Sequence, residues 1–188
     1  ADRYPSPDGP HRVRSETRRV SFLSRQDYLA KIQEQKDRLL SQLRSIYRQE
    51  RAAYDVIRAL DPQGDAFEQT CFLESARQDI LAERIALLCE GMHELVLDLT
   101  ANNISDQAEF EGLNALQARL AGISSNRINE AASRLRDLGP AANRDAAGVA
   151  ETARIINDAA RELGSVVLQL GVHEAMEVFA MELHVIAQ

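Results

Sequence analysis

The stretch SRQDYLAKIQEQKDRLLSQLRSIYRQERAAYDVIRALDPQG, residues 24–64, decides the fold class of this chain. Its apolar side chains recur every three or four residues, which is the spacing of one face of an α-helix. The stripe consists of Leu29, Ile32, Leu39, Leu43, Ile46, Ala53, Ile57 and Leu60, and Lys36 and Glu50 interrupt it. Ser24, with Asp27 three residues later, is typical of a helix start, and residues 61–64 (Asp-Pro-Gln-Gly) are typical of a turn. The stretch therefore predicts one long helix over about residues 25–60.

Three further stripes of the same kind follow along the chain. The second contains Phe67, Cys71, Leu81, Ile85, Leu88, Met92, Leu95 and Leu99; the weaker third contains Leu113, Leu116, Leu120, Ile123, Ile128, Leu135 and Leu138. The fourth begins near Asp145 and carries Val149, Ala153, Ile156, Ala160, Leu163, Val167 and Leu170. The stripes predict helices over about residues 66–101, 105–138 and 145–187.

Helix-end signals separate these stripes. Asp65 with Glu68, and Asp106 with Glu109, have the spacing of a capping box, and Gly139-Pro140 ends the third stripe. Four long helices with short connections predict an all-α, elongated up-down-up-down four-helix bundle with antiparallel, coiled-coil-like packing. The alternative is two long hairpins that pair only by dimerising, because another chain would then complete the weak third stripe.

The composition sets the broad class of the protein. The chain has 188 residues, 45% of them hydrophobic, which is enough for one domain with a buried core. No window of 18 apolar residues and no signal-peptide pattern are visible, so we expect no membrane span. Cys71 and Cys89 lie about 27 Å apart along one helix and cannot form a disulfide. These features favour a bacterial protein in the cytoplasm, which is a reducing compartment.

The charges are distributed unevenly along the chain. Residues 1–60 hold 13 Lys and Arg against 8 Asp and Glu, whereas residues 61–188 hold 9 against 21, so the net charges are +5 and −12. Residues 1–24 are rich in proline near their start and predict a flexible tail that precedes a bundle over residues 25–188. The basic side chains that follow the prolines are Arg12, Arg14, Arg18, Arg19 and Arg25. Because the rest of the chain is acidic, nucleic acid is an unlikely partner.

The last helix carries two apolar faces. On a helical wheel the stripe of residues 149–170 lies on one side, and a second stripe lies on the opposite side. The second stripe consists of Val172, Met176, Phe179, Leu183 and Ile186. An isolated bundle buries one side of each helix, so the second stripe predicts a contact with the tail, with a second copy of the chain or with another protein. Alternatively, the helix breaks at Gly171 and a short final helix turns over the end of the bundle.

Few residues suggest catalysis or metal binding. Helical bundles hold di-metal centres through Glu and Glu-x-x-His, and the candidates here are Glu90, His93, His173 and Glu177. The wheel places Glu90 and His93 on the solvent side of their helix, so surface residues are the preferred interpretation. No nucleophile motif and no phosphate-binding loop is present, so we expect no catalytic residues, no cofactor and no enzymatic activity.

These patterns predict a class of function rather than a reaction. We expect a non-enzymatic protein–protein interaction module, such as an adaptor, a chaperone-like protein or a regulatory subunit. Its contact surface would be the second stripe of the last helix, and its partner a protein or a second copy of the chain in a homodimer. The alternative is a helical bundle that senses a small ligand or a metal.

Overall fold

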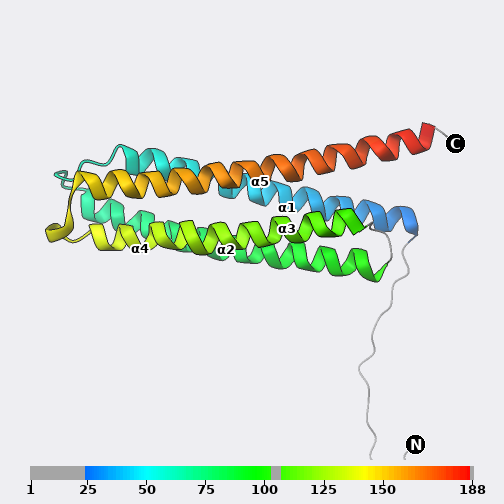
Figure 1. The fold of residues 1–188 in the computed structure, drawn as a ribbon, viewed down its shortest axis with the longest axis horizontal. Coiled ribbons are helices and arrows are strands. Elements are labelled where there is room, and N and C mark those ends of the chain that lie inside the picture. Colours follow the sequence, from blue (N-terminus) through cyan, green and yellow to red (C-terminus); the bar gives the residue numbers. More distant parts are fainter. Residues whose placement is uncertain (1–23, 103–106, 187–188) are drawn as a thin grey trace, which may run out of the picture.

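A computed structural model describes the backbone of residues 24–102 and 107–186, and the side chains in those ranges apart from residues 107–109, 141 and 172–186. The long helices are α1 (Arg25–Arg58), α2 (Phe67–Ala101), α3 (Gln107–Ile123), α4 (Asn129–Leu138) and α5 (Ala146–Ile186). Two short segments join them, the π-helical η1 (Ser124–Ile128) and the 3₁₀-helical η2 (Ala141–Asn143). The described residues contain no strand. The prediction of an all-α four-helix bundle is confirmed, with α3, η1 and α4 forming the third helix of the bundle (Figure 1).

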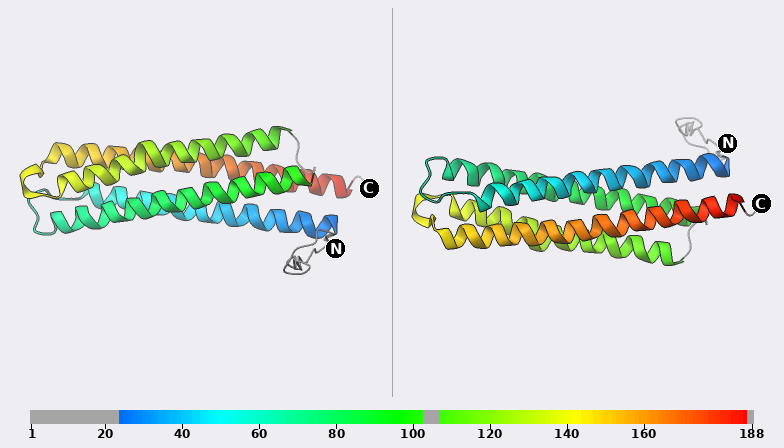
Figure 2. Two further views of the ribbon diagram at one scale, coloured as in Figure 1. Left: turned by 90° about the horizontal axis from the view of Figure 1, so that it is seen from below. Right: turned by 90° about the horizontal axis from the view of Figure 1, so that it is seen from above.

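The helices follow one long axis, and the molecule is a rod. The start of α1 and the end of α5 lie at the same end of this rod (Figure 2). At that end the Tyr28 hydroxyl, in the first turn of α1, donates a hydrogen bond of 3.0 Å to the carbonyl of Asp98 near the end of α2. Farther along, the side-chain amide of Gln78 in α2 donates a hydrogen bond to the carboxyl group of Glu50 in α1. Residue numbers thus rise on one helix as they fall on the other, so α1 and α2 run in opposite directions.

The helix ends show which local signals decide the fold. The Ser24 side chain caps α1 and accepts a hydrogen bond of 3.1 Å from the amide of Asp27, as the sequence predicts. The capping box predicted for Asp65 and Glu68 is wrong, because α2 begins after Ala66 with no side-chain cap. A backbone turn takes its place, in which the amide of Phe67 donates to the carbonyl of Gly64 at 3.1 Å. The Asp106–Glu109 pattern lies outside the described residues.

A π-helical turn explains why the third stripe is weak in the sequence. Its buried residues Ile123 and Ile128 are five positions apart, whereas an α-helix repeats a face every three or four residues. The segment η1 spans this step. In a π-helical turn the hydrogen bond joins an amide to the carbonyl five residues before it, instead of four as in an α-helix. Both isoleucines therefore point into the core, at 1% and 0% exposure. The third helix packs within its own chain, and no second chain is required to complete it.

The core forms two apolar clusters along the rod. The larger contains Leu43, Ile85 and Leu163 and lies toward the start of α1. The smaller contains Ile57, Phe67 and Leu135 and lies toward the turn between α1 and α2. A buried polar layer of Glu50, Glu74 and Gln78 falls between the two clusters in both helices.

The last helix does not break at Gly171. Helix α5 continues as one segment to Ile186, so the alternative of a short final helix folded over the bundle end is wrong. Its outermost described apolar core residue is Leu170, which is 8% exposed.

Candidate interaction surface

The predicted contact residues lie outside the part of the structure in which side chains are described. These residues are Val172, Met176, Phe179, Leu183 and Ile186. The described residue next to them on the same helical face is Leu168, four positions before Val172. Its side chain is 70% exposed, the largest exposure of a large apolar residue among the described ones. Leu168 is not one of the predicted contact residues, but it extends the same helical face toward the bundle and faces solvent.

A second apolar surface lies on α2 and was not predicted. Five of the seven large apolar side chains that are exposed in the described part of the chain belong to this helix: Phe72, Leu73, Ile80, Leu87 and Leu97. Leu73, Ile80 and Leu87 are seven residues apart and 47%, 54% and 65% exposed. A seven-residue repeat keeps them in line along the helix, as in one position of a coiled-coil heptad. We call these three residues the α2 stripe.

A groove extends this apolar surface toward the third helix of the bundle. It has a volume of about 600 Å³ and lies between the start of α2 and the end of α4. Its lining includes Phe72, Leu135, Arg136 and Gly139, and the Phe72 side chain is 69% exposed. A large side chain of another molecule can insert beside Phe72.

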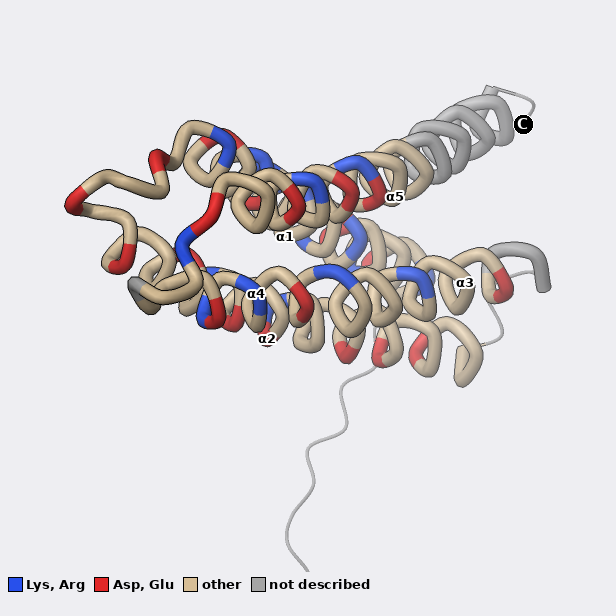
Figure 3. Tube along the Cα trace, turned by 60° about the vertical axis from the view of Figure 1, so that its left-hand side comes forward, with Lys and Arg blue, Asp and Glu red and all other residues tan. Residues whose placement is uncertain are grey.

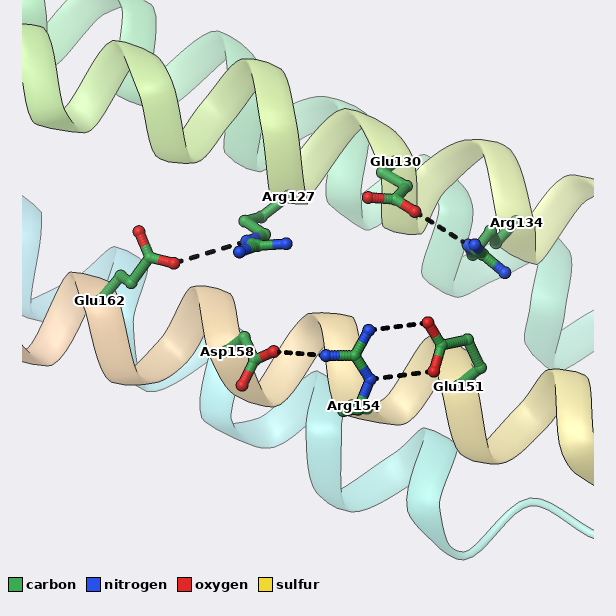
Figure 4. A network of polar contacts seen from close by, with 7 residues as sticks. All are labelled: Arg127, Glu130, Arg134, Glu151, Arg154, Asp158 and Glu162. Carbon is green, nitrogen blue, oxygen red and sulfur yellow. Dashed lines mark hydrogen bonds and ion pairs between the residues drawn. The ribbon is translucent and has the colours of Figure 1, made fainter.

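The side of the bundle formed by α4 and α5 is covered by ion pairs instead. Arg154 binds both carboxylate oxygens of Glu151, at 2.8 and 2.9 Å, and also Asp158 at 3.0 Å. Arg127 of η1, which precedes α4, binds Glu162 of α5 at 3.4 Å (Figure 4). These charged side chains bind one another and leave little apolar area for a partner. The surface of α4 and α5 is therefore polar, whereas the α2 stripe is apolar.

The C-terminal part of α2 is strongly acidic. Glu90 and Glu94 are exposed, and Asp98 is half-buried and lies 3.6 Å from Lys31 of α1. Figure 3 shows acidic positions and no basic ones along the last turns of this helix. The sequence has no Lys or Arg between Arg84 and Arg119. The surface there is therefore apolar and negatively charged at once.

The buried polar layer contains the most strongly perturbed carboxyl group of the described residues. Gln78 donates a hydrogen bond of 2.8 Å to one carboxylate oxygen of Glu50, which is 0% exposed. Burial raises the pKa of Glu50 to about 7; the bond from Gln78 lowers the pKa and the nearby Glu74 raises it. Burial also raises the pKa of Glu74, which Arg77 counteracts through an ion pair and a hydrogen bond. One oxygen each of Glu50, Glu74 and Gln78 has no hydrogen-bond partner.

Sequence reasoning missed this layer, although the sequence carries a signal for it. Glu50 interrupts the first stripe, and the second stripe has a gap between Cys71 and Leu81 in which Glu74 and Gln78 lie. When α1 and α2 are paired in opposite directions, the two interruptions meet at one level. A coincidence of gaps in neighbouring stripes is the pattern that predicts a buried polar layer.

The candidate metal ligands do not come together in the described structure. Glu90 and His93 are both exposed, as the wheel predicts, and His173 and Glu177 lie outside the residues with described side chains. No group of three or more His, Cys, Asp or Glu side chains suited to a metal ion occurs among the described residues. Cys71 is buried and Cys89 half-buried, and burial raises the pKa of both thiols, which disfavours the reactive thiolate.

Of the five arginines predicted for the basic tail, the structure describes only Arg25. Arg25 is exposed in the first turn of α1, and Arg12, Arg14, Arg18 and Arg19 lie outside the described residues. None of the helices in the described part of the chain combines the length and hydropathy that a bilayer-spanning segment needs.

Comparison of the chain with protein-family models, with curated proteins and with solved structures gave no match. The apolar surfaces of α2 and α5 are therefore the basis for the function proposed for this chain.

Proposed function

We propose that this chain is a non-enzymatic protein-binding module that docks an amphipathic helix of its partner on the α2 stripe. The observation that carries the proposal is the alignment of Leu73, Ile80 and Leu87 on the solvent side of a helix whose other side is already packed in the core. Helix-in-groove recognition uses anchors with this helical spacing. A heptad row of exposed leucine and isoleucine fits a second helix lying alongside α2.

The exposed area indicates how long the contact must be. Full burial of a leucine or isoleucine side chain contributes about 1.5–3 kcal/mol, so covering each half-exposed member of the α2 stripe contributes about 1 kcal/mol. Micromolar binding requires about 8 kcal/mol in total. The three residues therefore do not suffice, and we propose that Phe72 with its groove and Leu97 extend the contact along α2.

The stripe at the end of α5 gives the module a second surface. Helix α2 packs on α1, α3 and α4, and α5 packs on the same neighbours, so α2 and α5 lie diagonally across the bundle. Leu168 on α5 and the α2 stripe then face different sides of the rod. Two apolar faces on different sides suit an adaptor that joins two proteins, or a homodimer that still presents a free surface. Val172, Met176, Phe179, Leu183 and Ile186 are the residues proposed for the second surface.

The test compares substitutions on the two surfaces with a matched control. The tagged full chain is used to identify a partner, and the affinity of that partner is then measured with purified Ile80→Asp and Phe179→Asp. The control is Val56→Asp on α1, which alters an apolar side chain that is 38% exposed and lies outside both surfaces. We expect at least a ten-fold higher Kd, about 1.4 kcal/mol, for Ile80→Asp, and less than a two-fold change for the control. Phe179→Asp should weaken binding to the same extent for a partner that docks on the second surface. Light scattering on the same proteins reports whether the partner is a second copy.

Docking on the α2 stripe is wrong if Ile80→Asp binds every partner, including a second copy, as tightly as the wild-type protein. The second surface is wrong if Phe179→Asp does so. Circular dichroism confirms that each variant stays helical, so that loss of binding is not loss of folding.

One observation favours the alternative of a ligand- or metal-sensing bundle. The buried layer of Glu50, Glu74 and Gln78 presents three oxygen atoms without partners, and oxygen atoms are the ligands that hard cations prefer. If the layer senses a cation, Mg²⁺ or Ca²⁺ raises the melting temperature of the wild-type protein and not that of Glu50→Gln. Equal melting temperatures with and without these ions exclude this alternative.

A further inference from the structure

The acidic end of α2 presents a mixed apolar and negative face near the point where the chain enters the bundle. Leu87, Glu90, Glu94 and Leu97 follow one another at steps of three, four and three residues, so they share one face of the helix. All four are exposed, and the two leucines are 65% and 55% exposed. We call these four residues the acidic face.

We propose that residues 12–23 of the same chain bind this acidic face. The segment reads RVRSETRRVSFL and combines basic with apolar side chains, the two kinds that an apolar and acidic face attracts. Its four arginines are opposed by a single acidic residue, Glu16. Its apolar members include Val20, Phe22 and Leu23, which match the two leucines of the face.

The cations near the acidic face are already engaged, so its charge is not neutralised by the bundle. Lys31 lies 3.6 Å from Asp98, and Arg84 donates to Gln49 at 2.5 Å and to Ser45 at 3.2 Å. No Lys or Arg occurs in the sequence from residue 85 to residue 118. Arginine side chains supplied by another segment therefore meet uncompensated carboxylates at Glu90 and Glu94.

The fold brings the segment to the acidic face without a long linker. The hydroxyl of Tyr28 donates to the carbonyl of Asp98 at 3.0 Å and accepts from the amide of Asn102 at 2.9 Å, so α1 starts beside the last turn of α2. Positions 12 and 23 are eleven steps apart along the chain, and the segment reaches about 36 Å when extended. The distance along α2 from Ala101 back to Leu87 is about 21 Å. The segment therefore spans the whole face.

Tethering favours this occupant over a free partner. A short linker gives a local concentration in the millimolar range, so even a weak contact is populated. Because Leu87 belongs both to the α2 stripe and to the acidic face, the bound segment covers one end of the proposed partner surface. The inference itself stands on charge and connectivity, and does not depend on the proposed function.

The chain contains no tryptophan, so the variant Phe22→Trp provides a single fluorescence probe within the segment. In the full-length protein at low salt we expect an emission maximum shifted to shorter wavelength than in urea. Raising the salt to about 0.5 M screens the ion pairs and shifts the maximum back toward the urea value. Adding Glu90→Lys and Glu94→Lys to the probe variant has the same effect at low salt.

The matched control adds Asp55→Lys and Asp65→Lys instead, which change the charge equally at exposed positions near the other end of the rod. This control retains the short-wavelength emission. Adding Arg18→Glu and Arg19→Glu to the Glu90→Lys, Glu94→Lys protein restores it, because the reversed charges again attract.

Three results would overturn the inference. One is an emission maximum equal to that in urea, which means that residue 22 is exposed to solvent. Another is a short-wavelength maximum that does not respond to salt or to the α2 substitutions, which places residue 22 elsewhere. The third is a maximum that depends on protein concentration, which assigns the contact to a segment from a second copy. Partner affinity is measured separately with Ile80→Asp, so each hypothesis can fail alone.

Discussion

Replacing Glu50 by glutamine should stabilise the protein at neutral and alkaline pH. Glu50 is fully buried, and burial raises its pKa from 4.5 to about 7. Each unit of pKa shift corresponds to about 1.4 kcal/mol, so the shift corresponds to about 3 kcal/mol of unfolding free energy. A glutamine of the same shape accepts the same hydrogen bond from Gln78 and carries no charge at any pH.

The direction of the pH dependence follows from proton binding. Because the pKa of Glu50 is higher in the folded state than in the unfolded state, the folded protein binds more protons between these two values. The stability that the neutral carboxyl group provides is fully present below about pH 4.5. It is lost as the pH rises through about 7. The free energy of unfolding attributable to Glu50 therefore falls by about 3 kcal/mol over this window.

Urea denaturation at a series of pH values from about 4.5 to 8 measures this effect without changing the ionic strength. We expect the difference in unfolding free energy between Glu50→Gln and the wild-type protein to grow with pH and to favour the variant by up to about 3 kcal/mol at pH 8. Glu74 is present in both proteins, so only its interaction with the Glu50 carboxylate enters the difference. Glu83→Gln, an exposed carboxyl on α2, is the control and should give a flat difference. Parallel stability curves for Glu50→Gln and wild type would refute the reasoning, as would a less stable variant at pH 8.

Three further predictions concern the unfolding free energy, measured by urea denaturation at neutral pH. Ser24→Ala removes the cap of α1 and should cost about 1 kcal/mol, whereas no change would mean that the cap bond does not form in solution. Gly122→Ala should stabilise by up to about 1 kcal/mol, because a Cβ there meets no atom within 4 Å; destabilisation would show that η1 needs the glycine. Leu43→Ala, at 0% exposure, should cost about 2–5 kcal/mol, whereas Leu87→Ala, at 65% exposure, should change stability by less than about 0.5 kcal/mol. Equal costs for the two leucines would contradict the assignment of Leu87 to the surface.

The sequence predicted the bundle well because its apolar periodicity extends over many turns. Thirty or more residues of three- and four-residue spacing identify each helix even where a signal at one end is wrong. At the start of α1 the local signal is also right, because the helix begins where Ser24 and Asp27 predict. The pair Asp65 and Glu68 misled because capping-box spacing arises by chance, and here the backbone turn at Gly64 starts α2 without a side chain. The five-residue step at η1 made the third stripe weak because an α-helical wheel cannot represent a π-helical turn.

The α2 stripe was missed for a different reason. The stripe that begins with Phe67 and Cys71 is so regular that it accounts for α2 as a bundle helix and gives no sign of a second apolar side. Leu73, Ile80 and Leu87 show such a repeat at a period of seven in the sequence. Which side of the helix is outward depends on packing, and the structure supplies that information.

The polar layer also accounts for how these helices find one register. Stripes with a period of seven residues can slide past each other by one heptad and still bury apolar side chains. If α1 slid by seven residues along α2, Glu50 would lie opposite Cys71 or Ile85 instead of Gln78, and its carboxyl group would be buried without a hydrogen bond. Leaving a buried carboxyl group unpaired costs several kcal/mol, whereas the native register satisfies one of its oxygens. Glu50→Gln weakens this penalty and Glu50→Leu removes it. If the layer selects the register, disulfide crosslinking between cysteines introduced into α1 and α2 should detect more than one register in Glu50→Leu and one register in the wild-type protein.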